Sequence, residues 1–357
     1  MRLRLGTAAV AAATACLPFL LAPPSDAGAA PTPSWDERVL DPGQSFRGLD
    51  AVDGDTAWVA GESVDGGDPS VWRTTDGGAT WGEVGPTGVT GLLFRDVEAR
   101  SASTASVLAI GPGDTSRIYR TTDGGQSWAE TFRNGNPDAF YNCMDFYPGG
   151  RRGLAVSDAV GDAFRIIATD DFGRSWHELP TDGMPDSTGE FNFSASGDCL
   201  VIRGQQAYFG SGGAQARVFH SADRGLTWTA ADSGIAAGDG GGVFGLAFKT
   251  PFRGVAVGGD FLEPGNGEDA VATTRHGRTW VGGGDLTTLG EDAAYVSGRP
   301  HTLVAVGEYG GVGASHLSTD GGRTWTAFGA GFHTVDCTPD GSCWAAGSAG
   351  RVARLVR

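Results

Sequence analysis

The chain has 357 residues, 60 of them glycine, and it carries a formal net charge of −16. An acidic surface repels phosphate backbones, so this composition argues against a nucleic-acid partner. Glycine at this level, without a collagen period, indicates many tight turns and therefore many short strands.

The first thirty residues have the order of a secretory signal. Arg2 and Arg4 form a basic start, residues 5–22 are apolar apart from two threonines, and residues 27–30 are small. A lipoprotein would use Cys16, but the residues before it form a poor lipobox and those after it stay apolar. No other stretch reaches the roughly 18 apolar residues that span a bilayer. We predict a signal peptide over 1–30 and a secreted or cell-envelope location.

Four cysteines follow the predicted signal, and an even number in an exported chain favours disulfides over metal or redox roles. Cys337 and Cys343 flank a turn sequence centred on Asp340, so we expect them to face each other across a hairpin. Cys143 and Cys199 are then paired by elimination.

One short pattern recurs along the chain: a hydroxyl residue, a spacer, Asp, a spacer, Gly, a spacer, then Ser or Thr followed by Trp. Its six copies end at tryptophans 45 to 52 residues apart, the length of a four-stranded propeller blade. In the fifth copy Arg275 stands in place of the Asp. The copies are Thr74–Trp81, Thr121–Trp128, Thr169–Trp176, Ser221–Trp228, Thr273–Trp280 and Ser318–Trp325.

Each repeat also contains a nearly continuous apolar run, as expected of a strand buried on both faces between neighbouring blades. No segment has a convincing helical period. The runs are Trp58–Gly61, Val107–Gly111, Gly153–Ser157, Gly254–Gly258, Leu303–Gly307 and Cys343–Gly347.

The two chain ends supply a seventh blade. Residues 332–354 repeat the first three strands of a blade and stop before any box, whereas Ser34–Glu37 is similar to the strand that follows a box. Pairing the two ends closes the ring and removes an exposed sheet edge. We therefore predict an all-β, seven-bladed propeller of four-stranded antiparallel blades, as a single domain over 31–357, closed by a composite blade.

The boxes resemble the Asp-box, or BNR, repeats of sialidases and many other propellers. Over residues 34–357 the plan resembles the photosystem II assembly and stability factor family (Ycf48-like) and, more closely, exported bacterial propellers without an assigned function. This resemblance implies a propeller that binds a client protein. The arginine patch of that family is reproduced only in part, by Arg47 and Arg95. Six boxes specify a fold far better than they specify a function.

The recurring carboxylates of the boxes are expected to be structural. In such a hairpin the carboxylate accepts backbone N–H groups of its own turn, glycine adopts a positive φ, and tryptophan packs into the blade. These needs explain the residue types without a substrate, and the copy with Arg275 shows that one carboxylate can be lost. The predicted structural residues are Asp76, Asp123, Asp171, Asp223 and Asp320.

Propeller ligands usually bind where the chain enters the innermost strands and where second strands turn into third strands. Charged and aromatic side chains gather in these loops and form a candidate site. The alternative is a solvated rim that closes the pore with water-bridged charges. The first set of loops carries Arg47, Arg95, Tyr141, Glu190, Phe191, Phe244 and His333, and the second carries Glu62, Asp158, Asp260 and Glu308.

Two further carboxylates, Asp145 and Asp336, lie on predicted inner strands. Burial of these groups is costly unless they are paired, and Arg151 or Arg95 are candidate partners.

The leading hypothesis is an exported, monomeric, non-enzymatic binding or scaffold propeller that recognises a protein or a glycan on its channel face. The alternative is a glycoside hydrolase of the sialidase-like type, with Glu190 and either Asp158 or Asp260 as the carboxylate pair and Tyr141 as a further catalytic candidate. The three arginines of a sialidase cannot be assembled from the channel-facing positions. Glycine-rich fragments of a dinucleotide motif are expected by chance, and the histidines lack metal-ligand spacing, so no cofactor or metal is expected.

Overall fold

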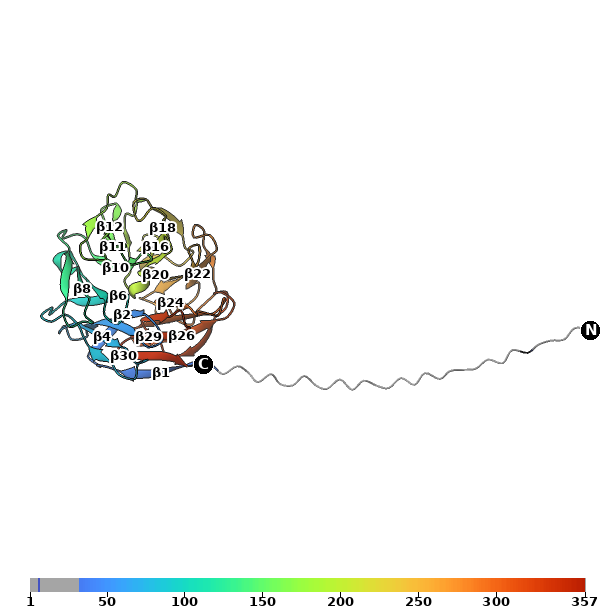
Figure 1. The fold of residues 1–357 in the computed structure, drawn as a ribbon. Coiled ribbons are helices and arrows are strands. Elements are labelled where there is room, and N and C mark those ends of the chain that lie inside the picture. Colours follow the sequence, from blue (N-terminus) through green and yellow to red (C-terminus); the bar gives the residue numbers. More distant parts are fainter. Residues whose placement is uncertain (1–5, 7–31, 357) are drawn as a thin grey trace, which may run out of the picture. The chain divides into compact units, whose positions relative to one another are not determined.

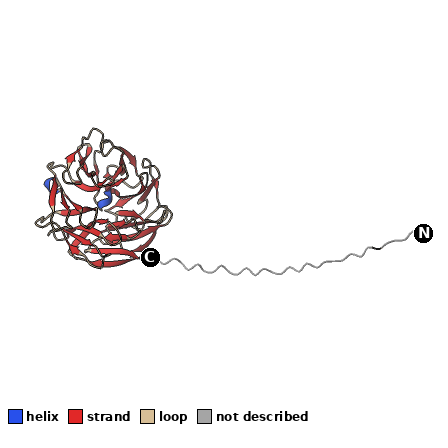
Figure 2. Cartoon of the chain, in the orientation of Figure 1, coloured by secondary structure: helices blue, strands red, loops and turns tan. Residues whose placement is uncertain are grey.

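Seven antiparallel sheets, six of four strands and one of six, surround a central axis in the computed structural model (Figure 1), which describes residue 6 and residues 32–356. The predicted seven-bladed propeller is confirmed. The predicted signal peptide, apart from Gly6, lies outside the described residues and stays a prediction. Among the described residues, no helix is long and apolar enough to cross a membrane. Figure 2 shows that nearly all regular structure in the propeller is strand.

Each blade runs outward from an inner strand at the axis. The inner strands of blades 1 to 7 are β2 (Gln44–Ala51), β6 (Leu93–Ala99), β10 (Tyr141–Phe146), β15 (Leu200–Arg203), β20 (Gly238–Thr250), β24 (Asp292–Tyr295) and β28 (Thr334–Cys337). The second strands are β3 (Ala57–Ser63), β7 (Ala105–Ile110), β11 (Gly153–Val160), β16 (Gln206–Gly210), β21 (Arg253–Asp260), β25 (Leu303–Tyr309) and β29 (Cys343–Ala346).

The outer half of each blade is more exposed than the inner half, above all in the fourth strands. The third strands are β4 (Ser70–Thr74), β8 (Arg117–Thr121), β12 (Ala163–Thr169), β18 (Arg217–Ser221), β22 (Val271–Thr274), β26 (Val312–Ser318) and β30 (Arg351–Val356). The fourth strands are β5 (Gly82–Glu83), β9 (Ala129–Arg133), β13 (His177–Glu178), β19 (Thr229–Asp232), β23 (Val281–Gly282), β27 (Thr326–Gly329) and, in blade 7, β1 (Ser34–Val39).

Blade 5 is extended at its inner edge. Two short strands, β14 (Glu190–Phe191) and β17 (Gly212–Gly213), add to β20, so the sheet has six strands. Two short 3-10 helices, η1 (Gly113–Thr115) and η2 (Gly197–Cys199), complete the regular structure of the described residues.

The predicted closure is present in blade 7. Strand β1 pairs antiparallel with β30, with Trp35 opposite Leu355. The Trp35 ring contacts Phe328 and Phe332, and its Nε1 donates to Ser315 Oγ at 2.8 Å. The N-terminal strand is therefore fixed both to its own blade and to blade 6.

Apolar side chains pack between adjacent blades because the second strands are covered on both faces. Trp58 of blade 1 and Phe94 of blade 2, for example, are fully buried in one cluster with Val71 and Val107. The nearly continuous apolar runs of the sequence correspond to these buried strands, as predicted.

The box hairpins have the hydrogen bonds expected of a structural turn. Asp76 accepts Thr80 N at 2.8 Å and Thr80 Oγ1 at 2.6 Å, and Thr74 Oγ1 donates to Asp76 and accepts Gly78 N at 3.0 Å. The same bonds recur at Asp123, Asp171, Asp223 and Asp320.

The fifth box is a shortened turn and not a simple replacement of Asp by Arg275. The hydroxyl at the strand end is Thr274, which accepts the N–H of Gly277, three residues later, at 2.9 Å. In the other boxes the corresponding glycine is four residues later. The expected substitution is therefore a one-residue deletion relative to the strand end.

Both predicted cysteine pairs lie within disulfide distance. Cys337 and Cys343 face each other across the β28–β29 hairpin with their Cα atoms 4.1 Å apart. Cys143 on β10 is bonded to Cys199 at the end of η2, with a Cα separation of 5.9 Å and a sequence separation of 56.

Candidate ligand site at the upper mouth of the channel

We call the end of the channel where the inner strands begin the upper mouth, and the end where they finish the lower mouth. At the upper mouth four inner strands carry a β-bulge, at Arg47, Arg95, Asn142 and Phe244. A bulge inserts one residue without a cross-strand partner and redirects its side chain. After two of these bulges the chain has glycine: a Cβ on Gly48 or Gly245 would lie 3.0 Å or less from the backbone of the next blade.

The two bulged arginines form a paired charge cluster. Arg47 donates to Glu291 at 3.0 Å, and Arg95 donates to Glu62 at 3.1 Å. Glu291 also accepts from His333 Nδ1 at 2.7 Å and from the backbone N–H of Glu308 at 2.9 Å. Burial acts to raise the pKa of Glu291, but the charges of His333 and Arg47 hold it below its ordinary value. The carboxylate therefore stays ionised.

Residues 192–199, which we call the plug, cross the channel between its two ends. Figure 2 shows the helical turn η2 near the centre of the ring. Arg95 donates to the carbonyl of Ser194 at 2.8 Å, and Arg47 donates to that of Ala195 at 2.9 Å. The disulfide of Cys199 ties the lower end of the plug to β10. The arginines and the disulfide therefore fix the same segment.

A cavity of about 200 Å³, the mouth pocket, lies above the plug. Four of its ten lining residues are aromatic, with Phe193 against Phe244 and Phe261 at ring-centroid distances of 5.5 and 5.8 Å, and Phe261 against Tyr309 at 5.4 Å. The lining residues are Arg47, Arg95, Phe193, Ser194, Ala195, Phe244, Phe261, Leu289, Glu291 and Tyr309.

The predicted site residues divide into two groups. Arg47, Arg95 and Phe244 line the mouth pocket. Glu62 pairs with Arg95, and His333 pairs with Glu291. Glu308 lies beside them and pairs with Arg351 at 2.6 Å. Tyr141 is different: it is fully buried against Phe132, and its hydroxyl has no hydrogen-bond partner. The expectation that Tyr141 reaches the mouth is wrong, because the ring is part of the core.

The carboxylates expected to form a catalytic pair have separate structural partners. Glu190 is 1% exposed and accepts two hydrogen bonds from Arg217 and one from Ser211. Asp158 accepts from the side chain of Asn142 at 2.9 Å and from the backbone of Asn192 at 2.8 Å. Burial raises the pKa of Asp158 to about 6. Asp260 accepts the N–H of Leu262 at 2.8 Å. None of the three carboxylates lines the mouth pocket.

Below the plug, carboxyl groups line the channel, and we call them the carboxyl ring. Five of them accept a backbone N–H from the next blade, so they join the inner strands to one another. The pairs are Asp50 with Ala99, Asp96 with Met144, Asp145 with Ile202, Asp292 with Val335 and Asp336 with Ala51. Glu98 and Asp198 complete the ring and interact electrostatically with these groups.

The expected arginine partners of Asp145 and Asp336 are therefore wrong. Backbone N–H groups satisfy both carboxyl groups, whereas Arg95 pairs with Glu62 and Arg151 donates to the carbonyl of Asp170. Burial and mutual repulsion raise the pKa of the ring carboxyls, to about 7 for Asp145 and Asp292.

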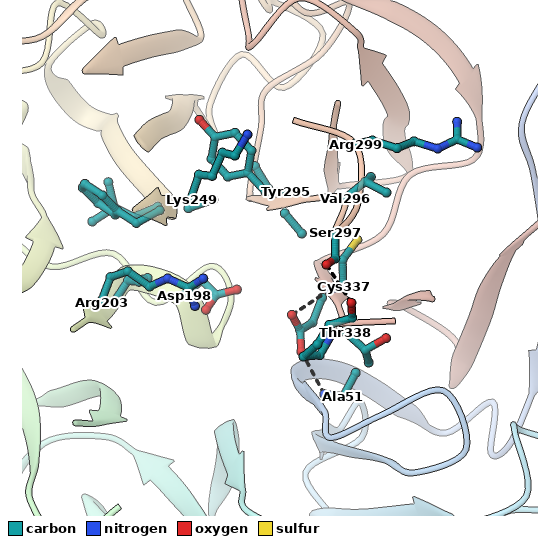
Figure 3. A pocket seen from close by; sticks show the side chains of 18 of the residues that line it. Ala51, Asp198, Arg203, Lys249, Tyr295, Val296, Ser297, Arg299, Cys337 and Thr338 are labelled. Atoms are coloured by element: carbon teal, nitrogen blue, oxygen red, sulfur yellow. Dashed lines mark hydrogen bonds between the residues drawn. The ribbon is translucent and has the colours of Figure 1, made fainter. Parts of the chain in front are cut away.

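The carboxyl ring opens into a chamber of about 690 Å³ at the lower mouth. In Figure 3, Asp198 and Arg203 face the open space from the side opposite Cys337 and Thr338. Among the described residues, no group of three or more His, Cys, Asp or Glu side chains is arranged to hold a metal ion.

Sequence reasoning missed the residues that complete the upper site. Glu291, Phe193, Phe261 and Tyr309 stand in loops or at strand ends where no period marks them. The signal that could have found the aromatic wall is the Phe191-Asn192-Phe193 segment, which follows a stretch without a strand pattern.

Neither a known protein-family profile nor a curated protein sequence matches the chain. Solved structures do match its fold. Ycf48 bound to D1 peptide has a TM-score of 0.61 at 18% identity over 90% of this chain and 95% of that chain. Ycf48 from Cyanidioschyzon merolae has a TM-score of 0.60 at 18% identity over 90% and 98%.

The WD40 β-propeller domain of Doa1 is also similar, with a TM-score of 0.55 at 12% identity over 89% of this chain and 95% of that chain. At these identities the similarity shows a shared propeller fold.

Proposed function

We propose that this chain is an exported binding propeller that recognises a segment of another polypeptide at its upper mouth. The mouth pocket carries this proposal, because it is a preformed cavity with four aromatic side chains in its wall, at the end of the channel where propellers usually bind. One of the structures that share the fold is described as Ycf48 bound to D1 peptide, which supports a polypeptide ligand.

The polar groups of the site favour binding over catalysis. Hydrolysis of a glycoside needs two carboxyl groups on either side of the scissile bond, one of them free to transfer a proton. At the upper mouth Glu62, Glu291 and Glu308 each contact an arginine, and Glu190 is held by Arg217. These carboxylates are positioned to hold the site in shape.

The two cysteine pairs support the proposed location. Disulfides persist in oxidising compartments and are rare in the cytosol. The two bonded pairs therefore support our proposal that the chain acts outside the cytoplasm, as expected from its predicted signal peptide.

The proposal is tested with residues 31–357, purified with oxidised cysteines and used to select from a library of random 12-residue peptides. A glycan array and a panel of fluorogenic glycosides, including a sialoside, run in parallel. We expect selected peptides whose binding is lost in Phe191→Asp but kept in Phe252→Asp. These two phenylalanines are equally exposed, 48% each; Phe191 precedes the plug at the upper mouth and Phe252 lies in the β20–β21 hairpin at the lower mouth.

The outcomes separate the candidate functions. Peptides that bind equally well to both variants would place the ligand elsewhere. Binding to glycans without peptide selection would contradict the proposal, and glycoside turnover that disappears in Glu190→Gln would replace it with the hydrolase.

A further inference from the structure

The mouth pocket is shaped for one side chain. Apolar cavities of about 150 Å³ take up a benzene molecule. The mouth pocket, at about 200 Å³, therefore has room for a single aromatic ring and not for several residues. A partner segment can insert one side chain here while the rest of it stays on the surface.

The walls also suit an aromatic ring by their orientation. Phe193 meets Phe244 and Phe261 edge to face, with interplanar angles of 86° and 83°. Edge-to-face contacts bring the positive edge of one ring to the negative face of another. An inserted ring can continue this arrangement against Phe261 and Tyr309, which are tilted by 40° to each other.

The polar floor of the pocket has few free hydrogen-bond acceptors for the hydroxyl groups of a sugar. Arg47 is bonded to Glu291 and to the carbonyl of Ala195, and Arg95 is bonded to Glu62 and to the carbonyl of Ser194. The guanidinium groups of Arg47 and Arg95 and the carboxylates of Glu291 and Glu62 together have no net charge. A saccharide needs acceptors as well as donors for its hydroxyl groups. Both oxygens of Glu291 already accept hydrogen bonds, and the groups without a partner here, Nε of Arg47 and Nε of Arg95, are donors.

Exposed apolar side chains continue the pocket onto the surface. Leu262 is 65% exposed and follows Phe261, and Tyr309 is 39% exposed at the end of β25. Phe191 lies 6.4 Å from Phe193, centroid to centroid. Apolar groups exposed together beside a pocket mark an interaction surface.

We propose that the mouth pocket binds one aromatic side chain of a partner polypeptide, as the anchor of a segment whose neighbouring residues lie across Phe191, Leu262 and Tyr309. This inference rests on the proposed function and specifies the anchor of its ligand. Anchors of this kind, in fully desolvated pockets, carry most of the binding energy of an interface.

The anchor is tested by ligand-observed saturation-transfer NMR of residues 31–357 with small probes. The probes are the N-acetyl amides of phenylalanine, leucine and glutamine, and methyl glucoside. We expect transfer to the phenylalanine ring, less to leucine, and little to the glutamine and sugar probes. The double variant Phe261→Ala/Tyr309→Ala should weaken phenylalanine binding at least tenfold, and Phe252→Ala should not change it.

A second variant keeps the test decisive if the double variant fails to fold. Tyr309→Ala alone removes a partly exposed wall residue, and Tyr309→Phe keeps the wall. We expect phenylalanine binding to be lost in Tyr309→Ala and retained in Tyr309→Phe. Equal transfer to all four probes, preference for the sugar, or no response to the wall variants would overturn the anchor. If selected 12-residue peptides then still bind and are lost in Phe191→Asp, the polypeptide function stands and only the anchor fails.

Discussion

The two ends of the channel handle charge in opposite ways. At the upper mouth Arg47 and Arg95 each contact a carboxylate, so the charges are paired with side chains of opposite sign. At the lower end the carboxyl groups of the ring lie close to one another and are satisfied mainly by backbone N–H groups of the next blade. The plug separates the two regions, because Ser194 and Ala195 line the mouth pocket whereas Asp198 lines the lower chamber.

The difference shows how one channel can contain both a binding surface and a set of carboxyl groups that joins the blades. Paired ions keep their charge and geometry over a wide pH range, which suits a site that must stay preformed. Carboxyl groups that repel one another hold their protons more tightly, so the blades at the lower end are joined most firmly when the ring is partly protonated. The arginine–carboxylate pairs of the upper mouth should therefore respond less to pH than the carboxyl ring.

The largest effect is expected from removing the bond that holds the plug. In Cys143→Ala/Cys199→Ala, loss of a cross-link between residues 56 apart should lower the free energy of unfolding by about 4 kcal/mol on chain-entropy grounds. The matched Cys337→Ala/Cys343→Ala pair closes a much shorter loop and should cost about 2 kcal/mol. Urea denaturation of both pairs measures the difference. Equal losses would show that the plug does not depend on its cross-link.

The second-largest loss of stability should come from removing a single carboxyl group of the ring. Asp292→Ala leaves the backbone N–H of Val335 and the hydroxyl of Thr334 without their buried acceptor, a loss of about 3 kcal/mol. Asp292→Asn keeps an acceptor oxygen and removes a charge, so at pH 8 it should be neutral or stabilising. Chemical denaturation at pH 6 and pH 8 tests both variants. An Asn variant as unstable as the Ala variant at pH 8 would contradict the role given to the N–H bonds.

The pH dependence of stability distinguishes the two ends directly. Burial raises the pKa of Asp145 and Asp292 to about 7, above the ordinary value of 3.8. The stability from the protonated ring is therefore fully present below about pH 4 and is lost as the pH rises through about 7. One such proton gives a fall of about 1.4 kcal/mol per pH unit, or about 2 kcal/mol between pH 5.5 and 7.

The box carboxylates do not confuse this measurement. The pKa of Asp123 is lowered to about 2 by hydrogen bonds from Ser127 and Thr121, so its stabilising contribution is present above the ordinary value and is lost only in strong acid. Unfolding curves between pH 5 and 8 should show falling stability in the wild type and a flatter line in Asp145→Asn/Asp292→Asn. A wild-type stability that rises with pH would refute the account of the ring.

The smallest effect concerns the hairpins of the lower face. Arg224 has a φ of 68°, at a position where other boxes carry Gly77, Gly124 or Gly321. This backbone conformation costs a residue with a Cβ about 1 kcal/mol, so Arg224→Gly should stabilise the protein by about that amount. Phe172 has the same conformation, but its ring contacts Arg100 and Arg174, so Phe172→Gly should gain less. The melting temperatures of the two variants make the comparison.

The repeat made the fold predictable, because a fixed spacing of boxes and apolar runs leaves few alternatives. The composite blade followed from the fragments at Ser34–Glu37 and residues 332–354. Both disulfides were also within reach, since four cysteines and one hairpin leave a single remaining pair. These predictions depend on local residue patterns and on the number of cysteines, both of which can be read directly from a sequence.

The site was only partly predictable. Arg47 and Arg95 were found because they stand where inner strands begin, but the bulges that turn them into the channel have no sequence signature of their own. The plug could not be anticipated, because it is an irregular stretch before β15 that enters the axis. Asp145 was recognised as costly to bury, yet its partner is the backbone of Ile202, which no residue type reveals.

The pairing of β1 with β30, which we call the clasp, has a consequence for the order of folding. Glu37 and Arg351, which meet in blade 7, are 314 positions apart, whereas the strands of other blades are joined by short hairpins. Closing so long a loop costs about 1.5 kcal/mol more entropy than closing one of blade length. We therefore expect blades 1 to 6 to form before the ring closes. We expect the ring to open first at the clasp, so deuterium should enter the amides of β1 before those of the inner strands.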